Sequence, residues 1–291
     1  MMIPDQLQEL IEDGVIQSVR RPLKSGKEAA VFLVVVDGEL CAAKVYKAAD
    51  ARNFRKRADY VEGRRVGDSR QQRAMQSGSR FGQQQNEAAW QQVEADAMLR
   101  LAAAGVRVPR LHQHGNGVLL MDLVLGSDGE AAPQLAALQF SREDLLPSHG
   151  VIIRQIVRML CEDLVHGDLS EFNILLAADG PMIIDLPQAI DAARNNQARR
   201  LLLRDVNNVT RFFARFAPQL RRTDFGQEMW LLRENSALDP DSPLTGRFKE
   251  ARQHVDAEIV LREIEAAKQE AAERAEARQR GKERAAANRR R

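Results

Sequence analysis

Three polar residues with short spacing could carry phosphoryl-transfer chemistry in this sequence. Asn173 follows Asp168 five positions later, and Asp185 closes the apolar run that comes next. An amide oxygen beside a carboxylate can hold a divalent ion against phosphate oxygens, because magnesium prefers oxygen ligands. A carboxylate on the preceding loop, here Asp168, can take a proton from an attacking hydroxyl. These residue types at this spacing predict a phosphoryl-transfer site within residues 164–188.

A hairpin is needed to bring Asn173 and Asp185 together. Two apolar pieces, Ile174–Leu176 and Met182–Ile184, flank the turn-forming segment Ala177–Gly180. Apolar runs joined by such a segment are typical of a β-hairpin. The hairpin would carry one polar side chain at each side of its open end.

A second hairpin is predicted nearer the N-terminus. Val31–Val36 is rich in β-branched residues, a DG turn signal follows, and Leu40–Tyr46 forms the return strand that carries Lys44. The polar segment Arg21–Ala30 is expected to be a loop. A loop and a lysine placed in this way can cover a nucleotide and pair with its phosphates. A plain surface hairpin with an exposed lysine fits the same pattern.

The helices are predicted from apolar periodicity. Asn86–Ala104 has apolar residues on one side, and Glu94 lies among them as either a solvated edge residue or the partner of a buried Lys44. Phe140–Glu162 is also expected to be helical, with interruptions at Pro147 and Gly150, and Leu201–Phe216 to be a strongly amphipathic helix.

Composition places the chain among soluble globular proteins. It has 291 residues, of which 44% are hydrophobic and 29% charged, enough for one large domain or two lobes. The net charge of +2 is too small to identify a partner. No apolar run is long enough to cross a membrane and no leader is recognisable, so no membrane partner is expected. Cys41 and Cys161 are expected to be reduced core residues of a cytoplasmic protein.

Two segments have a biased composition. Arg55–Gln85 is polar and is expected to be a mobile insertion, either a solvated loop or a basic strap that contacts substrate or nucleic acid. From Thr245 the chain is rich in Ala, Glu, Arg and Lys, and its last part is basic. This tail is either a solvated helix that frays or an electrostatic arm for RNA or a ribosomal surface.

Four segments together resemble the RIO atypical protein kinases: SGKEAAVF, CAAKVYK, LVHGDLSEFNILL and IIDLPQ. The resemblance runs from about Pro22 to Phe216 and is closer to the branch without an N-terminal winged helix, since only about twenty residues precede the first segment. It implies an α+β, two-lobed protein-kinase-like fold in a trimmed form that lacks the peptide-binding subdomains. The expected parts are an N-lobe over 1–125 with an antiparallel sheet, one helix and the mobile insertion at about 55–85, a mostly helical C-lobe over 126–245, and a basic helical tail over 246–291.

The resemblance also implies roles for individual residues. Those implied to bind the nucleotide are Ser25, Gly26, Lys27 and Glu28 in the phosphate loop, Lys44 with its helix partner Glu94, and Asp122 and Val124 in the hinge that reads adenine. Asp168 matches the catalytic base, and Asn173 and Asp185 match the magnesium ligands. Asp185 is further expected to accept phosphate as an aspartyl-phosphate. His166 is expected to brace the backbone, and His112 and His114 to be ordinary loop residues.

The expected activity is that of a non-specific serine/threonine protein kinase (EC 2.7.11.1) that uses ATP with Mg²⁺, or alternatively Mn²⁺. It would act on an unknown protein or on itself, with ATP hydrolysis through Asp185 as an accompanying activity. One alternative is an ATP-gated binding protein associated with a ribosome or RNA, which the basic tail favours. Another is a small-molecule kinase, since such enzymes share the HGD motif. Pro187 replaces the glycine of DFG and no APE segment follows, which counts against a peptide-binding platform.

Overall fold

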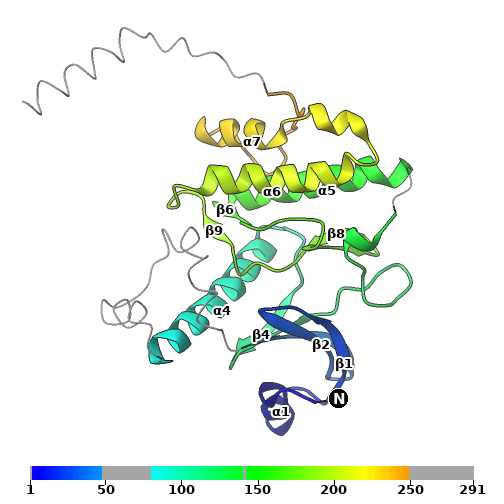
Figure 1. The fold of residues 1–291 in the computed structure, drawn as a ribbon, viewed down its shortest axis with the longest axis vertical. Helices are drawn as coiled ribbons and strands as arrows, with labels where there is room; N and C mark the ends of the chain where they lie inside the picture. The colour runs from blue at the N-terminus through cyan, green and yellow to red at the C-terminus, as the bar shows by residue number, and fades with distance from the viewer. Residues whose placement is uncertain (1, 48–79, 140–141, 249–291) are drawn as a thin grey trace, which may run out of the picture. The chain divides into compact units, whose positions relative to one another are not determined.

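The computed structural model describes residues 2–47, 80–139 and 142–248, without the side chains of residues 80–91 and 142–144. Met1–Phe248 forms one compact unit (Figure 1). The second unit, Lys249–Arg291, lies outside the described residues, and so do residues 55–79 of the predicted insertion. None of the described helices is both long and apolar enough to cross a membrane.

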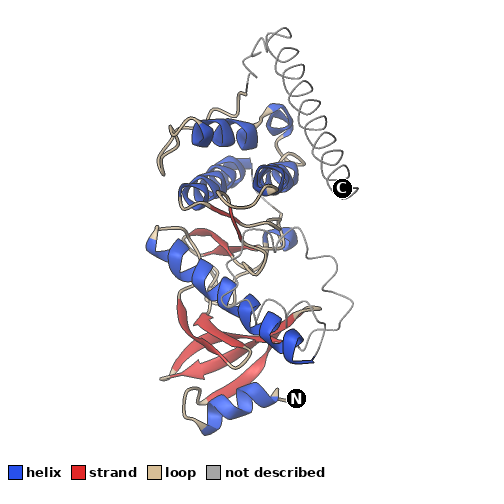
Figure 2. Ribbon diagram, turned by 90° about the vertical axis from the view of Figure 1, so that its left-hand side faces the viewer, coloured by secondary structure: helices blue, strands red, loops and turns tan. Residues whose placement is uncertain are grey.

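A five-stranded antiparallel sheet with the order β1-β2-β3-β5-β4 dominates the N-terminal half (Figures 1 and 2). Its strands are β1 (Ser18–Ser25), β2 (Ala29–Val36), β3 (Glu39–Tyr46), β4 (Leu111–Gly115) and β5 (Val118–Asp122). The predicted DG turn joins β2 to β3, with both residues at positive φ. The prediction of a loop over Arg21–Ala30 is wrong for most of that segment, because β1 reaches Ser25. Its proline, Pro22, is tolerated because β1 is an edge strand with a register shift after that residue.

The two faces of the sheet are covered by different helices. Cys41, Ala43 and Val45 alternate along β3 and pack with Leu7 of α1 (Asp5–Glu12) in one hydrophobic cluster. The intervening residues face the other way, because successive side chains of a strand point to opposite faces. That second face packs against α4 (Arg80–Ala103), whose Ala95, Met98 and Leu101 are buried with Leu119 of β5.

Helix α4 starts earlier than the sequence predicts. Arg80–Gln85 was assigned to the insertion, but its backbone is helical, in keeping with the good helix propensity of Arg and Gln. The helix ends at Ala103, one residue before the predicted end, and Gly105 beyond it takes a φ of 71°. The Val106 N–H bonds to Leu101 O at 2.9 Å and the Gly105 N–H to Ala102 O at 3.1 Å, which is a Schellman cap.

The C-terminal half is mostly helical. Its helices are α5 (Arg142–Cys161), α6 (Ala198–Phe213) and α7 (Phe225–Glu234), with the 3₁₀ helices η2 (Leu135–Ala137) and η3 (Pro218–Arg222). The predicted interruptions at Pro147 and Gly150 do not occur, and α5 is one continuous helix. Pro147 lies in its second turn, where the absent N–H costs a single intrahelical bond. The amphipathic helix predicted at Leu201–Phe216 is confirmed as α6.

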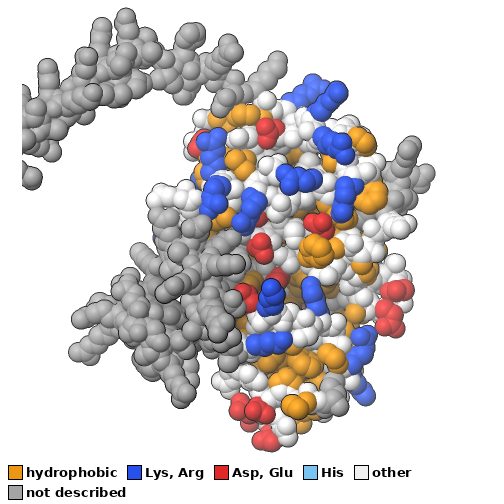
Figure 3. Space-filling view, viewed as in Figure 1, with side chains coloured by type: hydrophobic (Ala, Val, Ile, Leu, Met, Phe, Trp, Pro, Cys, Tyr) orange, Lys and Arg blue, Asp and Glu red, His pale blue; other side chains and the backbone are white. Residues whose placement is uncertain are grey.

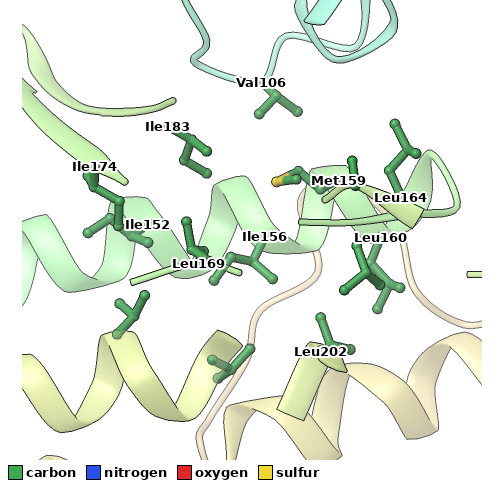
Figure 4. Close-up of a cluster of buried hydrophobic side chains, with 14 of the residues drawn as sticks. Val106, Ile152, Ile156, Met159, Leu160, Leu164, Leu169, Ile174, Ile183 and Leu202 are labelled. Carbon is green, nitrogen blue, oxygen red and sulfur yellow. The ribbon is translucent and has the colours of Figure 1, made fainter. Parts of the chain in front are cut away.

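Four short strands connect these helices. β7 (Ile174–Ala177) and β8 (Gly180–Ile183) form the predicted hairpin, and β6 (Leu164–Val165) pairs with β9 (Ile190–Asp191). Figure 4 shows how the hairpin joins the core: Ile174 and Ile183 point toward Ile152 and Ile156 of α5, with Leu202 of α6 on the far side of α5. The hairpin and the loop before it are therefore fixed by burial. The lobe boundaries at residues 125 and 126 stay a prediction.

Candidate active site

Lys44 is the centre of the site, and the register of the sheet explains its position. It lies on β3 between Val31 of β2 and Leu119 of β5, and its side chain faces α4. Lys44 is 7% exposed and Glu94 of α4 is 2% exposed, so each needs a partner of opposite charge. The Lys44 Nζ atom donates to Glu94 Oε1 at 2.7 Å and to Oε2 at 2.9 Å. The interpretation of Glu94 as the partner of a buried lysine is confirmed.

Glu94 has two further donors that the sequence reasoning missed. The Tyr46 hydroxyl donates to Glu94 Oε2, and the Leu186 N–H donates to Oε1 at 3.1 Å. Burial, together with the Glu94 carboxylate, raises the pKa of Tyr46, so the phenol stays a donor. One sequence signal pointed to Tyr46: it lies two residues after Lys44 on the same strand and hence on the same face.

Asp185 completes the cluster from the opposite part of the chain. The Lys44 Nζ atom lies 2.5 Å from Asp185 Oδ1, and Asp185 has a φ of 68°. A positive φ is uncommon outside glycine but less costly for Asp than for branched residues. Burial by itself would raise the pKa of Asp185, but Lys44 outweighs this effect and holds it below its usual value. Lys44 in turn has a raised pKa despite its burial, because two carboxylates face it.

His166 holds the backbone of the loop that carries Asp168. His166 Nε2 lies 3.1 Å from the Ile184 carbonyl, and its Nδ1 lies 3.3 Å from the Asp168 N–H. A carbonyl only accepts, so Nε2 carries the proton and Nδ1 accepts from the Asp168 N–H. Burial lowers the pKa of His166, which agrees with this neutral form. His166 therefore braces the backbone, as the sequence predicts.

Asp168 itself is exposed, whereas its neighbour Leu169 is 1% exposed within the C-lobe core. This alternation points the carboxylate away from the core. Partial burial raises the pKa of Asp168, while Arg204 and His166 act in the opposite direction. The Asn173 side chain donates through Nδ2 to the Asp168 carbonyl at 2.8 Å, which links the loop to the start of β7.

A buried aspartate of α6 holds the same loop, and the sequence reasoning missed it. Asp205 is 1% exposed and accepts from the Gly167 N–H at 2.8 Å and from the Leu169 N–H at 3.1 Å. Arg204 donates to the Gly167 carbonyl. Gly167 has a φ of 81°, which a residue with a Cβ would adopt only with strain. The available signal was an acid within the apolar positions of an amphipathic helix.

The residues matched to a phosphate loop lie at the turn between β1 and β2. Ser25 ends β1, and Gly26, Lys27 and Glu28 are exposed. Lys47 closes the loop, since its Nζ donates to Gly26 O at 2.7 Å and to Ser25 Oγ at 3.1 Å.

Asp122 and Val124 lie where the sheet ends, outside the Lys44 cluster. The Asp122 side chain is bonded to His112 Nε2 at 2.7 Å, so its carboxylate is engaged away from the site. The Val124 carbonyl accepts from the Ala132 N–H at 2.8 Å. Its own N–H has no hydrogen-bond partner in the part of the chain that the structure describes. A backbone donor left open in this way is what a purine ring nitrogen needs.

The donor set at the hairpin mouth fits a magnesium ion. The Ile184 N–H bonds to Asn173 O at 3.0 Å, so Asn173 and Asp185 flank the same end of the hairpin. Asp185 Oδ1 accepts a hydrogen bond from Lys44 Nζ, whereas Asp185 Oδ2 has no hydrogen-bond partner among the described residues. One carboxylate and one amide oxygen suit Mg²⁺ when substrate phosphates complete its shell. Within the described ranges, no group of three or more His, Cys, Asp and Glu side chains could hold a metal.

The cysteines are free, as expected. Cys41 is buried and Cys161 is partly buried, and burial raises the pKa of both thiols. Neither is a reactive thiolate.

Comparison with known proteins agrees with this geometry. Residues 30–226 match the family model of the RIO domain. The serine/threonine-protein kinase RIO1 of Caenorhabditis elegans is 32% identical over 205 residues, which cover 70% of this chain and 38% of that protein. The RIO-type serine/threonine-protein kinase Rio1 of Haloferax volcanii is 34% identical over 208 residues, which cover 71% of this chain and 67% of that protein. Its counterpart in Methanocaldococcus jannaschii is 35% identical over 196 residues, 66% of this chain and 62% of that protein.

A solved structure shows the same fold. The Rio2 kinase of Chaetomium thermophilum, in an ADP/Mg²⁺-phosphoaspartate complex, superposes with a TM-score of 0.52 at 22% identity, over 72% of this chain and 59% of that chain. The predicted two-lobed protein-kinase-like fold is thus confirmed. This chain spans between 38% and 67% of the length of these three curated relatives. The family model matches most of the described residues, and Lys44, Glu94 and Asp185 form one ion-paired cluster. The chain therefore belongs to the RIO family.

Proposed function

We propose that this protein transfers the terminal phosphoryl group of ATP to a Ser or Thr hydroxyl, on another protein or on itself, with Mg²⁺ as the metal. The observation that carries the proposal is the position of Lys44, which touches both Glu94 of α4 and Asp185 of the C-lobe. A lysine held between two carboxylates is oriented before the nucleotide arrives. Prior orientation of charge is the main contribution that a protein makes to phosphoryl transfer.

The nucleotide would lie between the sheet and the hairpin. The open Val124 N–H would bond to the adenine ring, and Lys44 with the Ser25–Glu28 loop would hold the phosphates. Asn173 and Asp185 would hold the magnesium ion, which supplies charge neutralisation at the phosphates when bound. The names of the relatives, all serine/threonine-protein kinases, support this reading.

Asp168 would hold the acceptor hydroxyl and receive its proton. Its side chain is exposed while its backbone is fixed by His166 and Asp205, so the carboxylate is presented at a constant position. Partial burial raises its pKa, which makes it a better proton acceptor than an ordinary carboxylate. Proximity and orientation then supply most of the remaining acceleration.

A second candidate is an ATP-driven switch in which Asp185 itself accepts phosphate. Its Oδ2 oxygen has no partner among the described residues. Attack by that oxygen on the terminal phosphorus would expel ADP and form an aspartyl-phosphate, which water would then hydrolyse. In support, the Chaetomium thermophilum structure is described as a phosphoaspartate complex. The path from Gln188 to α6 also contains only the short strand β9 as regular structure, which leaves little room for a peptide-binding platform.

The proposal also extends to the type of activity, the partners and the location of the protein. Generic EC 2.7.11.1 activity rests on the names of the relatives alone. A small-molecule kinase is disfavoured by the family match, and a screen of small alcohols and amines would test it. RNA or ribosome contact would rest on the basic tail beyond residue 248. A cytoplasmic location is supported by the two free cysteines.

The test combines two variants with analysis of the phosphorylated product. Asp168→Asn should keep the affinity for Mg²⁺–ATP within about twofold and lose at least about 100-fold in Ser/Thr phosphorylation. Asp185→Ala should lose magnesium-dependent nucleotide binding, measured by titration calorimetry. Asp5→Asn, an exposed carboxylate on α1, is the matched control. Full transfer by Asp168→Asn would reject the kinase mechanism. Mass spectrometry that finds phosphate only on Asp185, in a form that hydroxylamine removes, would favour the switch.

A further inference from the structure

Four arginines line the outer side of α6 and the residues just beyond it. They are Arg200, Arg204, Arg211 and Arg215, here called the arginine stripe. With 3.6 residues per turn, the first three point within about 40° of one another. The opposite side of the helix is buried in the core. Figure 3 shows Lys and Arg side chains spread over the part of the surface where α6 lies in Figure 1.

The stripe runs beside the loop that carries Asp168. Arg204 donates to the Gly167 carbonyl immediately before Asp168. Beyond the end of the helix, Arg215 lies 3.5 Å from the Glu171 carboxylate and 4.3 Å above the Phe212 ring. Two of the four stripe arginines, Arg204 and Arg215, therefore contact the Asp168 loop.

The local charge is not balanced. Four arginines meet two carboxylates: Arg204 lies 3.8 Å from the buried Asp205, which also accepts from the loop backbone, and Arg215 lies 3.5 Å from Glu171. Arg211 is exposed and has no hydrogen-bond or ion-pair partner among the described residues. Like charges one or two turns apart on a helix repel, so this arrangement costs stability unless an anion binds there.

Two exposed phenyl rings accompany the arginines. Phe172 lies between Asp168 and Asn173 and is 55% exposed, and Phe216, next to Arg215, is 41% exposed. Aromatic and arginine side chains together are typical of binding surfaces rather than of inert ones.

We propose that the arginine stripe binds the acidic flank of a polypeptide whose Ser or Thr is presented to Asp168, with Phe172 and Phe216 as apolar contacts. The inference rests on the proposed role of Asp168. From Arg200 to Arg211 the helix rises about 16 Å, which matches about five residues of extended polypeptide. The substrate should therefore carry several Asp, Glu or phosphorylated residues within about five positions of the acceptor. A nucleic acid would satisfy the charge but carries no Ser or Thr hydroxyl, which is the acceptor in the proposed function.

The experiment measures peptide binding separately from phosphoryl transfer. A labelled peptide with one Ser among Glu residues is compared with versions that carry Gln or Arg instead, by fluorescence anisotropy with the full chain, Mg²⁺ and a non-hydrolysable ATP analogue. The Glu peptide should bind at least about tenfold tighter than the Gln peptide. Arg200→Glu and Arg211→Glu should each weaken binding of the Glu peptide about fivefold and reduce the salt dependence of that binding. The matched control is Arg20→Glu, which makes the same charge change near the end of β1 that lies farthest from the phosphate loop. This variant should bind the Glu peptide as tightly as the unchanged protein.

Each possible outcome either supports or overturns the binding of an acidic peptide by the arginine stripe. Equal affinity for the three peptides, or equal loss in Arg20→Glu and Arg211→Glu, overturns it. Tighter binding of a single-stranded RNA with the same arginine dependence overturns it in favour of a nucleic acid. If Glu-peptide binding depends on the stripe but no peptide is phosphorylated, the stripe is supported and the kinase proposal fails. Unchanged circular dichroism in the variants excludes misfolding as the cause.

Discussion

At the scale of residues, the site depends on charges that are matched by donors from distant segments. Lys44 brings one positive charge to two carboxylates, and Tyr46 and the Leu186 N–H supply the remaining bonds to Glu94. Burying ions is costly, and an ion pair compensates only when its other lone pairs are also satisfied. The network therefore gives Lys44 a defined geometry more than it adds stability.

Asp205 provides a prediction about pH at this scale. Burial raises its pKa to about 7 from the usual 3.8, although the Gly167 and Leu169 N–H groups and Arg204 lower it. Between pH 4 and 7 the folded chain thus keeps a proton that the unfolded chain has lost. The contribution of Asp205 to the free energy of unfolding is greatest below about pH 4, falls as pH rises toward 7 and then stays constant. Asp205→Asn cannot titrate and should lack this slope.

Urea unfolding at pH 5 and pH 8 checks this expectation. The free energy of unfolding of the wild type, relative to Asp205→Asn, should be lower at pH 8 than at pH 5 by on the order of 2 kcal/mol. Asp5→Asn, at an exposed position, should show no such change. A difference between the wild type and Asp205→Asn that is the same at both pH values would contradict the raised pKa.

At the scale of elements, three sides of the helix α6 have three different roles. Its apolar side builds the core with α5 and α7, Asp205 supports the Asp168 loop, and its outer side carries the arginine stripe. Because an α-helix is rigid over its sixteen residues, these positions are fixed relative to one another. Packing of the helix thus controls the position of the proposed base.

Two phenylalanines near the end of this helix give a matched pair for stability. Phe213 is 0% exposed and packs edge-on against His149 and Phe212, whereas Phe216 is 41% exposed. Phe213→Ala leaves a cavity in the core and should lower the free energy of unfolding by about 3–5 kcal/mol. Phe216→Ala should cost less than about 1 kcal/mol. Chemical denaturation measures both, and equal losses would mean that the helix is not anchored through Phe213.

At the scale of the molecule, Lys44 and Asp185 connect the sheet of the N-terminal half to the hairpin of the C-terminal half. That ion pair lies entirely within the unit Met1–Phe248, as do all the core residues that the structure describes. Residues 249–291 are divided from this unit and lie outside the described residues. The chemistry and the basic tail should therefore be separable.

Truncation after Phe248 tests this separation. The shortened chain should unfold within about 2 °C of the full chain, since 1 kcal/mol shifts the midpoint of a domain this size by about 2–4 °C. It should also bind Mg²⁺–ATP equally well. If the tail is an arm for RNA, the truncated chain should bind RNA more weakly, and its affinity should change less with salt concentration. Loss of ATP binding on truncation would contradict the independence of the two units.

The local parts of the site were predictable from sequence, because they depend on neighbours along the chain. Asp168, Asn173 and Asp185 lie within one loop and hairpin, and the two hairpins and α6 follow from apolar periodicity and turn residues. Errors arose where pairing or packing overrode composition, as in β1 over Arg21–Ser25, the first turns of α4 and the unbroken α5 at Pro147.

The sequence alone identified the residues that could carry the chemistry and indicated the RIO family. How those residues are held became visible only in the folded chain. The bonds from Leu186 to Glu94 and from Leu169 to Asp205 join residues 92 and 36 positions apart, and the Arg204 and Arg215 contacts place α6 against the Asp168 loop. Such contacts leave no local pattern, because they depend on where buried polar groups find partners once the core has packed.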